Sequence, residues 1–126
     1  MKLFVYGTLR HGAPMHGLID GDALRLGPAR VHARLLDLGN FPGLVHAVTA
    51  DDWVRGELYR IEAQAASALF ARLDRYEGDA FERAEDAVLD ASGVSMRAWL
   101  YRYRGATRTG HHVASGDWLA YVSGRT

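Results

Sequence analysis

Residues 65–78 read AASALFARLDRYEG and carry the strongest helical pattern in the chain. Apolar side chains recur there at the spacing of one helix face: Ala66, Leu69, Phe70 and Leu73. Gly78 stands where a glycine commonly ends a helix, so we predict a helix from Ala63 to about Tyr76. Glu77 follows Leu73 by four residues and therefore extends the same apolar stripe.

Glu77 is the unusual residue of this stripe. A carboxylate on the buried face of a helix costs free energy unless it is paired, protonated or facing a cavity. Partial burial and the negative end of the helix would both raise the pKa of Glu77 toward the range useful for proton transfer. Two other interpretations stay open: the stripe emerges into solvent at the helix end, or Glu77 pairs with an arginine such as Arg83.

The other regular segments are short. Their residues either alternate between apolar and polar or form a short apolar run, and both patterns are typical of strands. We predict strands over Lys2–Tyr6, Ala29–Leu35, Leu44–Val48, Trp53–Ile61, Phe81–Leu89 and Val94–Tyr103. A last helical turn is expected after Asp117, which has the side chain of a helix cap. Several short strands with one good helix favour an α+β fold with a curled or barrel-like sheet.

The composition excludes several classes of protein. The chain has 126 residues, 15 basic and 15 acidic side chains and no cysteine. This length predicts a single domain over residues 1–126, and the missing thiols exclude disulfides and thiolate chemistry. Zero net charge gives no reason to expect a nucleic-acid or membrane partner. Without a recognisable signal peptide or an apolar run of roughly 20 residues, we expect a cytoplasmic protein.

Common cofactor and catalytic motifs are missing from the sequence. Gly7 and Gly12 have the spacing of a P-loop, but Ala13 and Pro14 follow where lysine and a hydroxyl residue are required. No GxGxxG, GxSxG or HExxH pattern occurs. We therefore expect no cofactor and no metal site, and chemistry that rests on carboxylates, hydroxyls and backbone groups.

The segment FVYGTLR, residues 4–10, is the second candidate functional feature. A strand that ends in Tyr-Gly-Thr presents backbone N–H groups, a hydroxyl and a phenol at one edge. Such a turn can bind a carboxylate or a developing oxyanion. The other interpretation is an ordinary turn after a strand.

Together these residues resemble the gamma-glutamylcyclotransferase-like family. The resemblance rests on FVYGTLR, NFPGL at 40–44, VRGELYRI at 54–61, LDRYEG at 73–78 followed by FER, and SGDW at 115–118, in that order. The YGTL form is similar to the compact bacterial and gamma-glutamylamine branch. The resemblance implies an α+β fold in which a small mixed β-barrel is flanked by helices, with a pocket between the YGTL turn and Glu77.

The resemblance also implies an activity: the α-amine of a gamma-glutamyl group attacks its own γ-carbonyl and releases 5-oxoproline and a free amine. The implied site consists of Glu77 as general acid and base, with Tyr6, Gly7, Thr8, Leu9, Arg10, Phe41 and Tyr103 around the substrate. Arg10 would steer the α-carboxylate, although a surface arginine is the alternative. Phe81 departs from the tyrosine that often follows the EG element, so a hydrogen bond from that phenol is lost.

The implied partner is a small gamma-glutamyl compound, bound without cofactor or metal by a monomer or weak homodimer. The rival hypothesis is a non-catalytic domain of the same fold that binds a small metabolite, because a fold alone does not determine function.

Overall fold

Five strands form a closed barrel at the centre of the computed structural model, which describes residues 1–108 and 110–124. The strands are β1 (Lys2–Val5), β5 (Trp53–Ile61), β2 (Ala23–His32), β6 (Phe81–Asp90) and β7 (Ser95–Tyr103), in that order around the barrel. Neighbours pair antiparallel except where β7 returns to β1 in parallel, with Leu3 opposite Trp99. The predicted α+β fold with a small mixed barrel is confirmed. The predicted domain over residues 1–126 extends slightly beyond the described residues.

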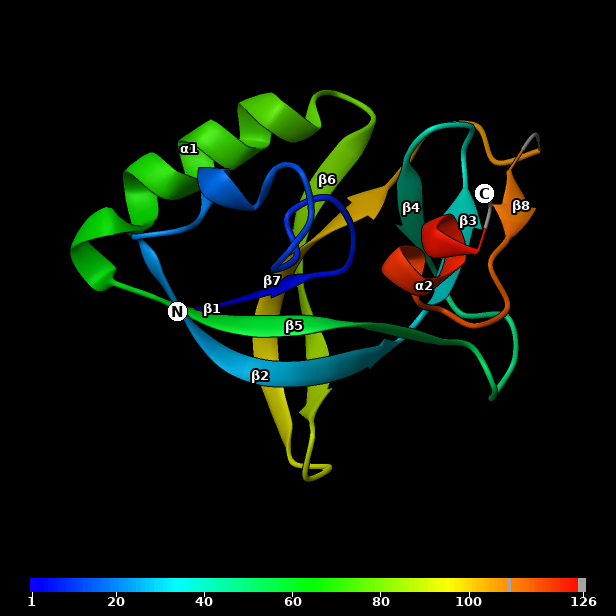
Figure 1. The fold of residues 1–126 in the computed structure, drawn as a ribbon, viewed down its shortest axis with the longest axis horizontal. Helices are drawn as coiled ribbons and strands as arrows, with labels where there is room; N and C mark the ends of the chain where they lie inside the picture. The colour runs from blue at the N-terminus through cyan, green and yellow to red at the C-terminus, as the bar shows by residue number, and fades with distance from the viewer. Residues whose placement is uncertain (109, 125–126) are drawn as a thin grey trace.

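A second, three-stranded sheet stands beside the barrel (Figure 1). It contains β4 (Pro42–Val45), β3 (Arg34–Asp37) and β8 (His111–His112), and the helix α2 (Trp118–Ser123) lies against it. The single strand predicted over Ala29–Leu35 is wrong, because the chain leaves the barrel at Ala33. That residue is fully buried, and its N–H donates to the carbonyl of Asp52 instead of continuing the barrel ladder.

The helix α1 (Ala66–Glu77) runs along one side of the barrel (Figure 1). Its buried residues are the predicted ones: Ala66, Leu69, Phe70 and Leu73. They share a core with Leu3 and Val5 of β1 and Tyr59 of β5. The predicted first residues form a separate 3-10 turn over Ala63–Ala65, and Gly78 ends α1 with a φ of 78°. The stripe thus brings Glu77 to the edge of the barrel, where β1 ends.

A second core fills the barrel and continues under the small sheet. It includes Phe4, Leu58 and Leu100 from barrel strands and Trp118 from α2. Another 3-10 turn, His16–Leu18, lies in the connection between β1 and β2. In the described ranges no helix is both long and apolar enough to span a membrane.

Gly56 of β5 allows β1 and β5 to approach closely, and this gives a test of the barrel. A Cβ at this position would overlap the carbonyl oxygen of Val5 and lie 2.9 Å from Cζ of Phe4. We expect Gly56→Ala to lower the free energy of unfolding by about 1–3 kcal/mol, because backbone cannot yield as a flexible side chain does. Urea denaturation measures the change.

Gly17→Ala is the matched control, since nothing lies within 4 Å of a Cβ at that position. Its effect should stay within about 0.5 kcal/mol. Equal unfolding midpoints for the two variants would contradict the packing described here.

Candidate active site

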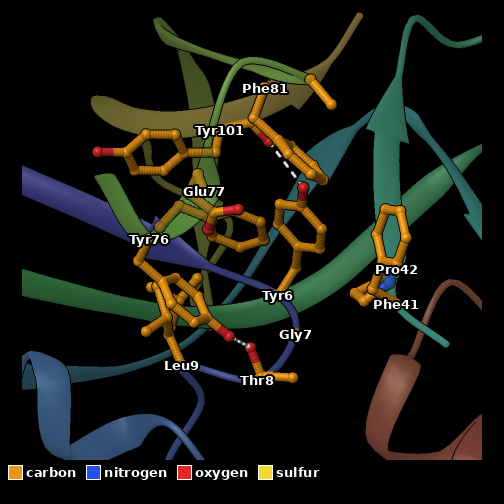
Figure 2. Close-up of a pocket in the computed structure, with 13 residues that line it drawn as sticks. Tyr6, Gly7, Thr8, Leu9, Phe41, Pro42, Tyr76, Glu77, Phe81 and Tyr101 are labelled. Atoms are coloured by element: carbon orange, nitrogen blue, oxygen red, sulfur yellow. Dashed lines mark hydrogen bonds between the residues drawn. The ribbon is translucent and has the colours of Figure 1, made fainter. Parts of the chain in front are cut away.

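A cavity of about 310 Å³ lies between the turn that follows β1 and the last turn of α1 (Figure 2). This volume is in the range of small-molecule sites. Its lining residues are Phe4, Val5, Tyr6, Gly7, Thr8, Leu9, Phe41, Pro42, Tyr76, Glu77, Ala80, Phe81 and Tyr101. Five of the predicted substrate-binding residues, Tyr6, Gly7, Thr8, Leu9 and Phe41, line it together with Glu77.

Glu77 extends its carboxylate from the end of α1 toward the middle of this cavity (Figure 2). Burial raises the pKa of Glu77 to about 7, and no described residue holds the carboxylate in a hydrogen bond or ion pair. Arg83 pairs with Asp74 instead, with Nε 3.3 Å from Oδ1. Of the three interpretations open from the sequence, the structure therefore supports a carboxylate that faces a cavity.

The opposite side of the cavity is the turn after β1, which is held close to the neighbouring strands. Tyr6 is buried, and its hydroxyl donates to the carbonyl oxygen of Tyr101 at 2.7 Å. Gly7 lies against Pro42, and a Cβ on Gly7 would lie 2.7 Å from Cγ of that ring. A larger residue at position 7 would thus require the turn or the Pro42 ring to shift.

The turn also carries unpaired backbone donors. The N–H of Arg10 donates to the carbonyl of Gly7 at 3.1 Å, but the N–H groups of Gly7, Thr8 and Leu9 have no backbone acceptor in the described ranges. All three of these residues line the cavity. Consecutive free N–H groups form a partial positive charge that suits an anion. This supports the anion-binding interpretation of the turn over an ordinary one.

A hydrogen bond joins the two sides at an exposed position. Oγ1 of Thr8 and the hydroxyl of Tyr76 are 2.6 Å apart (Figure 2). Tyr76 precedes Glu77, so this contact ties the turn directly to the segment that carries the carboxylate.

Arg10 lies outside the cavity lining, in an ion-pair network. Its Nε donates to Glu57 at 2.8 Å and its Nη1 to Asp117 at 2.8 Å. Glu57 also accepts from the N–H of His11 at 2.8 Å and from the hydroxyl of Tyr59 at 3.2 Å. This arrangement gives Arg10 a structural role in place of the expected contact with a substrate carboxylate. The segments YGTLR, VRGELYRI and SGDW thus meet at one guanidinium group.

Tyr103 also lies outside the lining. Its hydroxyl donates to the carbonyl of Ala106 at 3.0 Å, and its ring packs behind Phe41 and Phe81, with centroids 6.4 and 5.4 Å away. Tyr103 therefore supports the cavity wall from outside, and the expected direct contact with the glutamyl group does not fit this position.

Sequence reasoning missed Tyr76, Tyr101 and Pro42 as lining residues. Tyr76 could have been found from its place beside Glu77, at the edge of the apolar stripe. Tyr101 shares a strand face with Trp99 and Tyr103, but only the three-dimensional fold places its face toward α1. Its hydroxyl donates to Asp74 at 2.6 Å, and burial together with that bond raises the pKa of Tyr101 well above its usual range.

Metal ligands are not grouped in the described ranges. No cluster of three or more His, Asp or Glu side chains there could hold an ion. The lining residues include one carboxylate, that of Glu77, and the hydroxyl-bearing side chains of Tyr6, Thr8, Tyr76 and Tyr101.

Comparisons with known proteins agree with this geometry. The family model described as gamma-glutamyl cyclotransferase, AIG2-like, matches residues 3–120. The chain belongs to this family. The resemblance inferred from the sequence motifs is thereby confirmed. Membership of this family supports a gamma-glutamylcyclotransferase-like enzyme activity.

Three relatives illustrate the match. A protein of Vibrio cholerae is 35% identical over 122 residues, which are 95% of this chain and 96% of that protein. The gamma-glutamylcyclotransferase family protein YtfP of Escherichia coli K12 is 34% identical over 121 residues, or 94% of this chain and 96% of YtfP. The solution structure of Escherichia coli YtfP has a TM-score of 0.66 at 30% identity and covers 97% of this chain and 99% of that one. The gamma-L-glutamyl-butirosin B gamma-glutamyl cyclotransferase of Niallia circulans is 32% identical over 108 residues, 81% of this chain and 66% of that enzyme.

The ion-pair network predicts a large cost for removing one of its buried charges. The side chain of Glu57 is 5% exposed and that of Arg10 is 13% exposed. We expect Glu57→Gln to lower the free energy of unfolding by about 3–5 kcal/mol, because it leaves a buried guanidinium short of its partner. Chemical denaturation gives the value. Asp22→Asn is the control, because the Arg72–Asp22 pair is 36% and 41% exposed and should contribute less than about 1 kcal/mol.

Glu77 makes the stability of the fold depend on pH. Folding raises its pKa from 4.5 to about 7, so its stabilising contribution is complete below about pH 4.5 and is lost as the pH rises to about 7. Glu77→Gln removes that loss. The variant should match the parent near pH 4 and exceed it at pH 8 by on the order of 3 kcal/mol, measured by urea unfolding. The same gain at both pH values would argue against a buried, titrating carboxylate.

Proposed function

We propose that this protein is a gamma-glutamyl cyclotransferase that converts a gamma-glutamyl amine into 5-oxoproline and a free amine. The observation that carries the proposal is the carboxylate of Glu77, unpaired among the described residues, in a cavity whose other side is a turn with free N–H groups. A pKa near 7 suits a group that must accept a proton in one step and return it in the next.

Glu77 acts on the attacking nitrogen first. It accepts a proton from the α-ammonium group, and the neutral amine then attacks the γ-carbonyl carbon to form the C–N bond of a five-membered ring. Glu77 returns its proton to the departing nitrogen as the old C–N bond breaks. The ring nitrogen gives its surplus proton to the released amine, which leaves as an ammonium ion, so the charges balance.

The turn binds the other end of the glutamyl group. Among the described residues, no arginine, lysine or histidine lines the cavity, so we assign the substrate α-carboxylate to the N–H groups of Gly7, Thr8 and Leu9. Holding the carboxylate there and the α-amine at Glu77 bends the substrate toward the ring. The enzyme gains from proximity, because the reaction is intramolecular and needs a bent conformer.

Glu77→Gln tests this assignment. We expect release of 5-oxoproline from gamma-glutamyl amines to fall about 10²–10⁴-fold, because the amide cannot accept the proton, while the circular dichroism spectrum is retained. Glu82→Gln, on an exposed residue of β6, is the control and should keep the parent rate.

The pH dependence of kcat/KM tests the role of Glu77 a second time. Since the base must be ionised, kcat/KM of the parent should rise with pH through about 7 and then level off. Full activity of Glu77→Gln would overturn the mechanism. Thermal stabilisation by gamma-glutamyl compounds without any turnover would favour the non-catalytic binding domain instead.

A further inference from the structure

One wall of the cavity is aromatic and partly exposed. Phe41 and Phe81 lie at 6.1 Å between ring centroids, and Tyr103 backs both of them. The side chain of Phe41 is 42% exposed although it lines the cavity. Pro42 continues this wall down to the turn (Figure 2). Large apolar side chains exposed in a concave site are typical of a surface that a ligand covers.

The wall lies away from Glu77 and borders the turn only at Pro42. In Figure 2, Phe41 and Pro42 stand on the other side of Tyr6 from Glu77. A substrate with its α-amine at Glu77 and its α-carboxylate at the turn therefore has this direction left for the amine that departs. The leaving part of the substrate meets rings there, not solvated polar groups.

The charges around the cavity further restrict which leaving groups fit. Glu77 is the one acidic or basic side chain among the described residues that line the cavity. Two arginines of the barrel strands are engaged elsewhere: Arg102 donates to Asp86 at 2.8 Å, and Arg83 pairs with Asp74 and stacks on Phe70 at 4.4 Å. A second carboxylate on the leaving group would find no cation among the described lining residues, and its negative charge would oppose ionised Glu77.

A positively charged leaving group fits no better. The single carboxylate among the described lining residues is needed by the α-amine. A second ammonium would therefore have only the cation–π attraction of the phenylalanine rings, about 0.5–1 kcal/mol at an exposed site, in place of its hydration. An uncharged aromatic group, by contrast, can pack edge to face on the rings of Phe41 and Phe81.

Resting on the proposed function, we propose that the substrates of this site are gamma-glutamyl amides of apolar aromatic amines that carry no carboxylate, with the departing ring packed on Phe41 and Phe81. In this arrangement Phe41 determines specificity and takes no part in proton transfer. Its truncation acts on the choice of leaving group and leaves the chemistry at Glu77 intact.

Four substrates separate the possibilities. They share the gamma-glutamyl group and differ in the amine: phenethylamine, phenylalanine, propylamine and putrescine. Release of 5-oxoproline gives kcat/KM for each. We expect kcat/KM for the phenethylamide to exceed that for the phenylalanine dipeptide, which adds only a carboxylate, by about tenfold or more. The same margin is expected over the putrescine amide. Over the propylamide we expect an advantage of about tenfold.

Variants then locate the selectivity. Phe41→Ala should lower kcat/KM for the phenethylamide about five- to tenfold and leave the propylamide within about twofold. Val48→Ala is the control, because Val48 is 71% exposed and is not a lining residue. It should change neither value.

The outcomes distinguish this proposal from the one on which it rests. If kcat/KM is highest for the phenylalanine dipeptide or the putrescine amide, the aromatic-amine proposal is overturned and the cyclotransferase function still stands. The same follows if Phe41→Ala slows all four substrates equally. Absence of 5-oxoproline from every substrate would overturn both.

Discussion

The guanidinium of Arg10 is the point on which the rest of the site depends. It joins the turn after β1 to Glu57 of the barrel and to Asp117, which also caps α2 by accepting from the N–H of Ala120 at 3.1 Å. A buried ion pair is costly to form, and leaving one of its charges without a partner is costly as well. Here the arrangement fixes a turn whose own backbone donors stay free. The ion pairs of Arg10 with Glu57 and Asp117 thus hold the turn after β1 without using the backbone N–H groups of Gly7, Thr8 and Leu9.

At Glu77, the stability of the fold is set against the proton transfer that we propose for this residue. The apolar stripe of α1 would be more stable with an uncharged residue at its end, because desolvation disfavours the carboxylate there. Such a group persists when the surrounding packing fixes it in place. Leu69 and Leu73, both fully buried, provide that packing. The same burial that lowers the stability of the fold keeps the pKa of Glu77 near neutral pH.

The sequence predicted the parts of this site that follow from local periodicity. The stripe of α1 located Glu77, and the glycine-containing turn located the residues opposite, because both depend on neighbours within one turn of helix or one end of a strand. The ion pairs of Arg10 were not predicted, since its partners lie 47 and 107 residues away in the chain and no local pattern pairs them. The division of one predicted strand at Ala33 escaped notice for a similar reason. It depends on the carbonyl of Asp52, which only the folded chain brings near.

The parallel closure of the barrel has a consequence for how the protein is made. The turn after β1 meets its partners in two stages along the chain: β5 lies about 50 residues later, whereas Tyr101 follows Tyr6 by 95 residues and Asp117 follows Arg10 by 107. Contacts between residues far apart in sequence carry a larger loop-closure entropy than those between near ones. On the ribosome, β1 can therefore pair with β5 before Tyr101 and Asp117 have been synthesised. Until β7 is present, the carboxylate of Glu77 lacks the part of the cavity wall that Tyr101 provides.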